Sequence, residues 1–221
     1  MQRHVVEELL DHDLGTHQQI VDALEDLNTV NRWFGGTYTA TKLLRSGAAL
    51  TGKKEFSLLE VGAGSGYVPL FVQERLERQG TTINVTLLDC NWTHLPANGV
   101  PSVTGNALRL PFRDGAFDLV SCSIFTHHFD PDPLRHLLAE ALRVSRTAVV
   151  FNDLIRSRLH LLLVYLWLPF FRSRMSWNDG PASVRAAYTV PEMKSILADV
   201  PARRISVSRH YLYRMGVVIE K

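Results

Sequence analysis

One stretch of this 221-residue sequence decides its fold: Leu58-Leu-Glu60-Val-Gly62-Ala-Gly64-Ser-Gly66-Tyr-Val68. Residues 56–61 form an apolar run without an amphipathic period, which predicts a buried parallel strand. The glycines that follow permit a tight turn and let backbone N–H groups approach a ligand closely. Pro69 then stands where the first turn of a helix tolerates proline, and the helix is expected to continue over Leu70–Arg78. The stretch therefore predicts a strand, a ligand-binding loop and a helix.

Further strands alternate with helices towards the C-terminus. Strands are expected over Ile83–Asp89, Ser102–Gly105, Phe117–Ser121, Thr147–Phe151, Ile205–Ser208 and Arg214–Glu220, the last two as antiparallel neighbours. Asp132-Pro133 predicts a helix that begins with Asp132 as N-cap, and Thr189–Glu192 has capping-box spacing for a helix that reaches about Asp199. This alternation predicts a Rossmann-like α/β fold with a mostly parallel seven-stranded sheet and an antiparallel last strand. Ligands of such sheets bind at the carboxyl ends of the strands.

The residues before the glycine loop predict helices. Thr16–Asn31 carries apolar residues at helical spacing, Gly35-Gly36 ends that helix, and a second helix is expected over about Thr39–Leu50. We expect one domain, with an N-terminal helical extension (1–50), a core (56–151), an insertion (154–188) and a C-terminal helix with two strands (189–221).

Bulk composition narrows the class of protein. The chain has 24 basic and 22 acidic residues, so the charge balance does not indicate a nucleic-acid partner. Acids and histidines interrupt the first dozen residues, unlike the apolar core of a signal peptide. Cys90 and Cys122 are expected on strands that flank a central strand, too far apart to form a disulfide. Two free thiols indicate a reducing compartment, and we expect the protein to be cytoplasmic.

The spacing of the glycines separates two kinds of nucleotide ligand. The dinucleotide fingerprint G-x-G-x-x-G would need a third glycine where Tyr67 stands. The sequence instead has G-x-G-x-G, preceded by the acid Glu60. In this it resembles the class I S-adenosylmethionine (SAM)-dependent methyltransferases, whose first motif is [E/D]-x-G-x-G-x-G. The resemblance extends over residues 56–151, through Leu87-Leu-Asp89, Gly105–Phe112 and Phe117–Val120.

The resemblance implies a fold, an activity and a cofactor site. It implies the class I methyltransferase fold with a helical substrate cap, and SAM as cofactor with S-adenosylhomocysteine as product. In the family an acid at the place of Asp89 accepts the ribose hydroxyls, and an acid or amide at the place of Asn106 contacts adenine. Glu60 braces the loop. The cofactor-binding residues implied are Glu60, Gly62, Gly64, Gly66, Asp89, Cys90, Asn106, Ala107 and Ser123. The alternative is a Rossmann-like domain that has lost its cofactor.

Two histidines follow the fourth strand, His127 and His128. Methyl transfer is an in-line displacement, and a base that takes the proton of a hydroxyl acceptor assists it. The segment lies beside the methyl donor in the family, so both histidines are candidates for the base or for a group that orients the acceptor. A structural role for the pair is the alternative. No metal site is expected, because two adjacent histidines lack a convincing third ligand.

Five residues are candidates for contact with the acceptor: Trp33, Phe34, Asp153, Arg185 and Tyr188. The two aromatic residues form either a flap over the site or an anchor for the N-terminal helices. Asp153 orients a histidine, contacts the substrate, or caps the next helix. Trp177–Tyr188 is expected to be loop first and helix afterwards, with Ser183 also near the pocket.

The apolar segment 159–171 bears on the substrate. It contains Pro169 and is shorter than the ~20 residues that cross a bilayer. It forms a buried helix, lines a pocket for a lipophilic acceptor, or contacts a membrane surface or another subunit.

The finer resemblance, carried by Asn31–Gly36 and Asn152–Arg156, is to UbiE-like methyltransferases that accompany bacterial polyketide synthases. We expect O-methylation of a small lipophilic, aromatic or polyketide-like acceptor. The alternatives are C-methylation of a quinone or phenol ring, and a non-catalytic SAM-binding subunit. The protein is expected to be a monomer or a homodimer.

Overall fold

The computed structural model describes residues 1–221 and contains one seven-stranded sheet. Its strands are β1 (Glu55–Val61), β2 (Thr82–Asp89), β3 (Ser102–Thr104), β4 (Phe117–Ser123), β5 (Ser145–Leu154), β6 (Arg204–His210) and β7 (Arg214–Glu220). They lie in the order β3-β2-β1-β4-β5-β7-β6. The first five strands are parallel, and β7 runs antiparallel to both β5 and β6. The predicted Rossmann-like sheet is confirmed.

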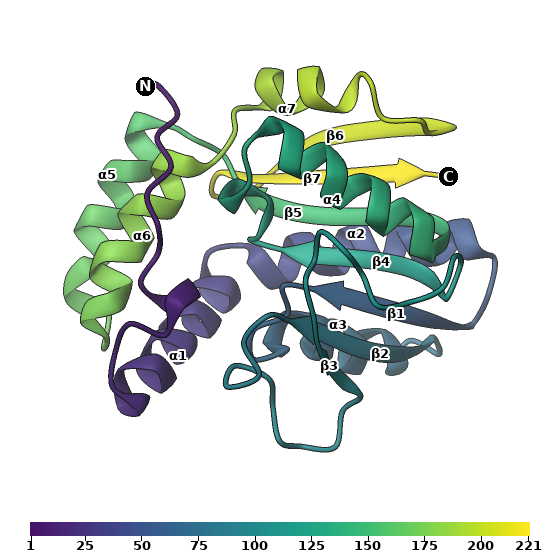
Figure 1. Cartoon of the computed structure of the whole chain (residues 1–221), viewed down its shortest axis with the longest axis horizontal. Coiled ribbons are helices and arrows are strands. Elements are labelled where there is room, and N and C mark those ends of the chain that lie inside the picture. Colours follow the sequence, from purple (N-terminus) through teal and green to yellow (C-terminus); the bar gives the residue numbers. More distant parts are fainter.

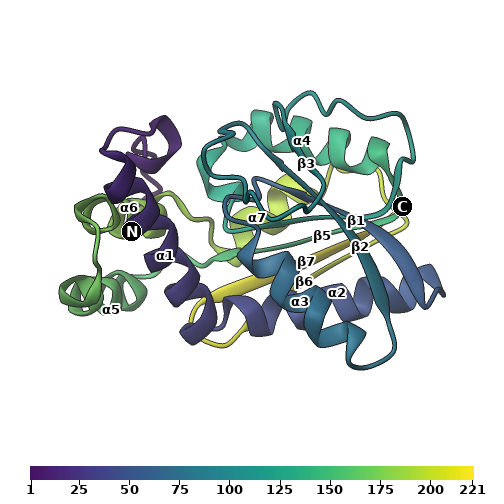
Figure 2. The ribbon, with the colours of Figure 1, turned by 90° about the horizontal axis from the view of Figure 1, so that it is seen from below.

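Helices cover both faces of the sheet. The helices are α1 (His17–Trp33), α2 (Gly36–Thr51), α3 (Tyr67–Glu77), α4 (Pro131–Val144), α5 (Arg158–Trp167), α6 (Arg174–Ala186) and α7 (Val190–Leu197). Three short 3-10 turns lie at Leu10–His12, Thr126–His128 and Leu168–Phe170. Apolar residues of α2 and α3 pack on one face, and those of α4 and α7 pack on the other (Figure 2). The central strands are therefore apolar on both sides, as parallel strands in a sheet covered on both faces are.

A third group of helices lies beyond the edge of the sheet. Figure 1 shows α1, α5 and α6 together on the side to which the arrowheads of β1, β4 and β5 point. This is the edge formed by the carboxyl ends of the parallel strands, where α/β proteins bind their ligands. The N-terminal segment ahead of α1 runs alongside α6 (Figure 1).

Hydrogen bonds at the helix ends explain where several helices begin. The predicted capping box at Thr189 is confirmed, with the Thr189 and Glu192 side chains bonding each other's backbone N–H groups. The prediction that Asp132 caps α4 is wrong by two residues. The N-cap is Asp130, because Pro131 takes the first helical position that suits proline. The Asp130 carboxylate makes no capping bond and instead accepts a hydrogen bond from Arg3 at 2.6 Å.

The expected loop at the start of Trp177–Tyr188 is also wrong, because α6 begins at Arg174 and is capped by Ser173. Gly180 lies inside this helix, where a Cβ atom would come within 3.3 Å of both Phe171 and Val164. The glycine therefore allows α5 and α6 to approach closely instead of breaking the helix.

The apolar segment 159–171 forms α5 and the 3-10 turn after it. The reading as a buried helix is wrong, since His160 is the one buried residue of α5. No helix combines the length and apolar character needed to cross a bilayer.

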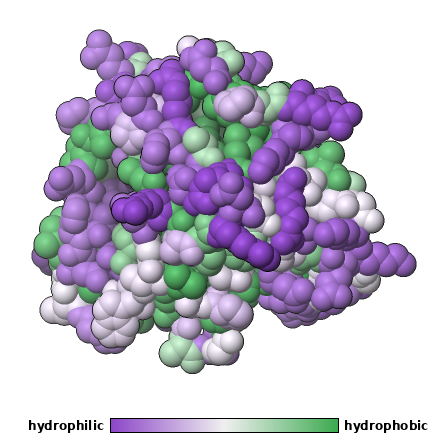
Figure 3. Space-filling model, turned by 45° about the vertical axis from the view of Figure 1, so that its right-hand side comes forward, coloured by the Kyte–Doolittle hydropathy of each residue, from purple (hydrophilic) through white to green (hydrophobic).

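The face of the molecule in Figure 3 is mainly hydrophilic, with hydrophobic residues showing in separate areas.

Candidate active site

The glycine loop connects β1 to α3 at the carboxyl edge. Gly62, Gly64 and Gly66 have φ of 66°, 51° and 69°, a left-handed backbone that other residues rarely adopt. A Cβ atom would lie 2.5 Å from the ring of Phe125 at position 62 and 2.6 Å from Leu87 at position 66. At Gly64 the nearest atom is 3.9 Å away. The loop is packed tightly at Gly62 and Gly66, whereas a Cβ atom at Gly64 would make only an ordinary van der Waals contact, with Leu24.

Asp89 ends β2 and holds the glycine loop in place. Its Oδ2 accepts a hydrogen bond from the Gly64 N–H at 2.8 Å, and its Oδ1 accepts one from the Asn91 N–H at 3.0 Å. A carboxylate has about four acceptor sites, so both oxygens can accept further bonds. Asn106 bonds the Leu108 N–H through Oδ1 at 2.8 Å, which leaves its amide N–H groups without a protein partner.

The remaining cofactor candidates occupy different environments. Ala107 is buried beside Asn106, whereas Cys90 directly follows β2 and is exposed. Ser123 ends β4 and accepts a hydrogen bond from Asn152 at 3.0 Å. Cys90 and Cys122 are both free thiols; Cys122 lies on β4 and Cys90 just after β2, the two strands that flank β1.

Glu60 is buried beneath the loop, with 2% of its surface exposed. Burial raises its pKa to about 7, although hydrogen bonds from Ser121 and Ser123 oppose the shift. The Ser121 hydroxyl donates to Oε2 from the neighbouring strand β4. Glu60 therefore joins two central strands and is partly protonated near neutral pH.

His127 is almost completely buried at the carboxyl edge, with 1% of its surface exposed. Its Nδ1 lies 2.8 Å from Asp153 Oδ1, and its backbone N–H donates to Oδ2 of the same carboxylate at 3.0 Å. The Thr126 hydroxyl also donates to Oδ2, at 2.5 Å. Asp153 thus holds the ring and the backbone of His127. It lies within β5 and is not a helix cap, since Ser157 caps α5.

Charge pairing determines the protonation state of His127. Burial alone lowers its pKa, but the carboxylates of Asp153 and then Glu8 outweigh burial and raise the pKa to about 10. Burial likewise raises the pKa of Asp153, but His127 and the hydrogen bonds to the carboxylate lower it to about 2. The pair is therefore an imidazolium and a carboxylate at neutral pH.

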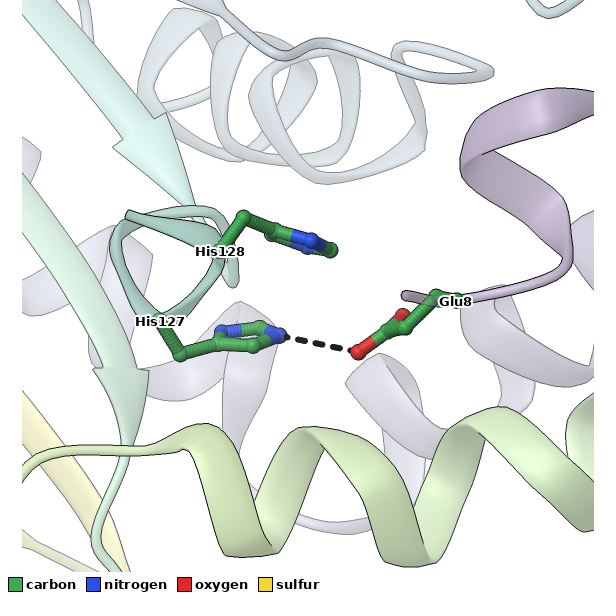
Figure 4. A group of neighbouring side chains, drawn as sticks. All are labelled: Glu8, His127 and His128. Carbon is green, nitrogen blue, oxygen red and sulfur yellow. Dashed lines mark ion pairs between the residues drawn. The ribbon is translucent and has the colours of Figure 1, made fainter. Parts of the chain in front are cut away.

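Glu8 reaches the histidines from the N-terminal segment. Figure 4 shows His127 and His128 on the turn after β4, with the Glu8 carboxylate approaching from the opposite side. The Glu8 Oε1 lies 3.4 Å from His127 Nε2, an ion-pair distance longer than a normal hydrogen bond. The Ser183 hydroxyl donates to the same oxygen at 2.5 Å, so Oε2 is free. The neighbouring ring of His128 pairs through Nδ1 with Asp11 at 2.8 Å.

An apolar cavity of about 340 Å³ opens beside these groups. It lies between α1, α5 and α6 and reaches the ends of β4 and β5 and the start of β7. Hydrophobic residues make up 15 of the 23 that line it. Its polar lining includes Glu8, Asp26, His160, Asp179, Ser183 and Arg214. The volume lies at the lower end of the range for small-molecule pockets.

The five candidate acceptor contacts divide between the cavity and its surroundings. Phe34 lines the cavity and packs edge-on against Trp167 at 4.7 Å, whereas Trp33 is 67% exposed. Arg185 donates to the Tyr165 hydroxyl at 2.5 Å. Tyr188 is buried and donates to the Phe129 carbonyl at 2.7 Å. Asp153, Arg185 and Tyr188 lie outside the cavity lining, whereas Ser183 belongs to it.

Sequence reasoning missed the charged residues of the cavity, Glu8, Asp26, Asp179 and Arg214. Glu8 lies in a segment without periodicity, which is placed by contacts with distant residues such as Asp179. Arg214 did carry a signal, because a charge opens the otherwise apolar run of the last strand.

The comparisons with known proteins agree with the fold and the loop. Residues 59–151 match the family model Methyltransf_11, described as a methyltransferase domain. The uncharacterized methyltransferase YcgJ of Bacillus subtilis (strain 168) is 30% identical over 99 residues. The alignment covers 42% of this chain and 37% of the length of that relative.

Two solved structures share the fold over nearly the whole chain. The plantazolicin methyltransferase BpumL, in complex with S-adenosylhomocysteine, has a TM-score of 0.68 at 12% identity and covers 96% of this chain and 93% of its own. A SAM-dependent methyltransferase from Aquifex aeolicus has a TM-score of 0.58 at 18% identity, over 89% of this chain and 96% of its own. The fold is that of the class I methyltransferases. With the family match, it supports a SAM-dependent methyltransferase.

Proposed function

We propose that this chain transfers the methyl group of SAM to an oxygen of a small lipophilic acceptor. The observation that carries the proposal is the apolar cavity of about 340 Å³, which opens at the carboxyl edge beside Glu8 and His127. A cavity lined mainly by hydrophobic residues favours an aromatic or polyketide-like acceptor over a polar metabolite.

The residues of the glycine loop fit SAM. Gly64 is the least crowded position of a loop whose other two glycines are closely packed. Asp89 has free acceptor sites for ribose hydroxyls, and Asn106 has free amide N–H groups for an adenine nitrogen. SAM supplies an electrophilic methyl group on its sulfonium. The residues that hold it in this proposal are Glu60, Gly62, Gly64, Gly66, Asp89, Cys90, Asn106, Ala107 and Ser123.

Glu8 is the group best placed to take the proton of the acceptor. His127 is already protonated at neutral pH and therefore cannot act as the base. Its imidazolium faces Glu8 Oε1, and Oε2 has no partner. As the acceptor oxygen bonds to the methyl carbon and the bond from carbon to sulfur breaks, the hydroxyl proton passes to Glu8. His127 and Asp153 position that carboxylate, and His128 lies beside it with Asp11.

Two alternatives remain within the proposal. The same cavity would suit C-methylation of a quinone or phenol ring. The exposed apolar side chains of α5, such as Leu159 and Leu162, would suit a SAM-binding subunit that acts with a partner chain. A cytoplasmic location and a link to polyketide synthesis belong to the proposal as well.

Calorimetric titration with SAM, S-adenosylhomocysteine and NADH tests the cofactor assignment. We expect micromolar binding of both sulfur compounds, weakened by Asp89→Asn but not by Asp132→Asn, which changes an exposed acid elsewhere. Binding of NADH instead would overturn the assignment. A screen of lipophilic phenols with product analysis by NMR then distinguishes O-methylation from C-methylation. Turnover that appears only with a partner chain would favour the subunit alternative.

A further inference from the structure

Arg214 is a charged side chain buried in the wall of the apolar cavity, with 1% of its surface exposed. Its Nε donates to the Phe34 carbonyl at 3.2 Å. Both terminal nitrogens, Nη1 and Nη2, are buried without a hydrogen-bond partner. An unpartnered polar group in such a place costs free energy, so these two donors point to a ligand.

No carboxylate of the protein neutralises Arg214, which forms no ion pair with any residue. Asp153 exerts some attraction, but Thr126, His127 and the backbone N–H of Leu154 occupy its oxygens.

The three acids of the cavity lining are also engaged elsewhere. Asp26 accepts hydrogen bonds from the N–H groups of Arg172 and Ser173, Asp179 accepts them from the segment before α1, and Glu8 faces His127. These acids therefore leave the charge of Arg214 unmatched.

Arg214 and its neighbour His160 differ in charge at neutral pH. Burial lowers the pKa of Arg214 to about 10, so the guanidinium remains charged at neutral pH. Burial also lowers the pKa of His160 to about 4, so this imidazole is neutral there. The His160 ring stacks on Tyr213 at 5.0 Å, and its Nδ1 bonds the Ile155 carbonyl at 3.0 Å. Arg214 is therefore the one cation of the cavity lining at neutral pH.

Backbone strain is concentrated around the same cavity. Four residues other than glycine have a positive φ, and three of them line the cavity: Ile124 (53°), Leu212 (51°) and Tyr213 (58°). Such strain costs free energy and persists where the surroundings enforce it, often at ligand sites. Leu212 and Tyr213 form the turn that immediately precedes Arg214 and fix its position.

We infer that Arg214 binds a carboxylate of the acceptor, so that the acceptor is a lipophilic hydroxy acid. The two Nη donors match the two oxygens of a carboxylate in a bidentate pair, the arrangement that guanidinium groups favour. The apolar walls then hold the hydrocarbon part of the molecule, and its hydroxyl faces Glu8. That the hydroxy acid accepts a methyl group rests on the proposed function. That it binds at Arg214 does not.

The test measures binding of octanoate and octan-1-ol, two probes of equal chain length, to the full chain by calorimetry. We expect octanoate to bind at least about tenfold more tightly than the alcohol. Arg214→Met replaces the guanidinium with an apolar side chain and should remove this preference without weakening the binding of octan-1-ol. Arg204→Met, at the exposed start of β6, is the matched control and should leave the preference unchanged.

Outcomes of this test are separable from those of the proposed function, since neither probe needs SAM. Equal affinity for the two probes, or no binding of octanoate, overturns the inference even if methyl transfer to neutral phenols is found. If the protein prefers octanoate but does not bind SAM, the carboxylate site at Arg214 is supported and the methyltransferase proposal is contradicted. Should Arg214→Met not fold, the wild-type comparison decides alone. Arg214→Lys would serve as a second variant, because it keeps the charge, loses the bidentate geometry and should reduce the preference.

Discussion

His127 is buried and positively charged, so its contribution to the free energy of unfolding depends on pH. Its pKa is about 10 in the folded protein against 6.5 for an ordinary histidine. The stabilisation is fully present below pH 6.5 and is lost as the pH rises towards 10. For Asp153 the pKa is lowered from 3.8 to about 2, so its contribution is present above pH 3.8 and is lost as the pH falls towards 2. Between about pH 4 and 6.5 both groups contribute fully.

Glu8→Gln tests whether the carboxylate of this residue takes the proton. The amide keeps the size of the side chain but cannot accept a proton, so kcat should fall by about 100-fold or more. SAM affinity, measured by calorimetry, should change less than threefold, because Glu8 lines the cavity that we propose for the acceptor. Glu7→Gln alters the exposed neighbour and serves as the control. An unchanged kcat for Glu8→Gln would exclude it as the base.

Glu60→Gln tests the buried acid beneath the loop. Since burial raises the pKa of Glu60 from 4.5 to about 7, wild-type stability should fall as the pH rises through this range. The variant cannot ionise, so its free energy of unfolding relative to wild type should increase by up to about 3 kcal/mol between pH 5 and 8. Urea unfolding at several pH values measures this difference. Glu55→Gln, exposed on the same strand, is the control. A stability difference for Glu60→Gln that stayed the same from pH 5 to 8 would contradict the raised pKa.

At the scale of elements, the turn between β1 and α3 depends on glycine for two separate reasons. Gly62 needs a left-handed backbone and also leaves room for the ring of Phe125. Gly80 shares the left-handed backbone, but no atom lies within 4 Å of the place that an added methyl group would occupy. Comparison of the two positions therefore separates backbone strain from crowding.

Gly62→Ala should lose stability and also weaken SAM binding by about tenfold or more, because the added methyl group displaces Phe125 and the loop. Gly80→Ala should cost only about 1–2 kcal/mol of strain and leave SAM binding unchanged. Calorimetry and thermal unfolding measure the two effects. If both variants bound SAM normally, the packing of Phe125 against the loop would have no part in cofactor binding.

The elements that could be predicted are those with a local signal. Apolar runs and glycine spacing located the sheet, and Thr189–Glu192 located α7 from its capping box. The predictions that were wrong concern elements whose structure depends on contacts with residues distant in the sequence. Gly180 and Pro181 are typical loop residues, yet packing between α5 and α6 keeps them helical.

The candidate site divides in the same way. The glycine loop, Asp89 and the two histidines were visible because they adjoin predicted strands. Glu8 was not, because its position depends on hydrogen bonds to α6 from a segment that lacks periodicity. The protonated state of His127 also required knowledge of both carboxylates that face it.

At the scale of the whole molecule, residues 1–13 connect parts of the chain that are distant in sequence. Arg3 donates to the carbonyls of Ala186, His127 and Phe129. Asp13 lies 2.7 Å from His94, after β2. This N-terminal segment therefore connects α6, the turn at Thr126–His128 and the loop after β2 around the site.

Deletion of residues 2–13 should leave the sheet folded but loosen the surroundings of the site. Hydrogen exchange should accelerate in α6 and in residues 124–130, while β1, β4 and β5 remain protected, because the core is formed without the segment. Turnover should be lost together with Glu8. Arg45→Ala, which removes a hydrogen bond between exposed residues of α2 and the loop after α3, should produce neither change. If exchange accelerated equally in all parts of the variant that lacks residues 2–13, the segment would support the whole fold.

The reversed direction of β7 has a consequence for how the specificity of such a protein can diverge. Because β7 runs against its neighbours, it presents its first residue, Arg214, at the edge where the parallel strands present their last. The three-residue turn ahead of it, Tyr211–Tyr213, can therefore change in length or in charge while the glycine loop remains intact. In the proposed function, the residues that bind the methyl donor and the residue that selects the acceptor thus lie in separate stretches of the gene, so that one set can change while the other is conserved.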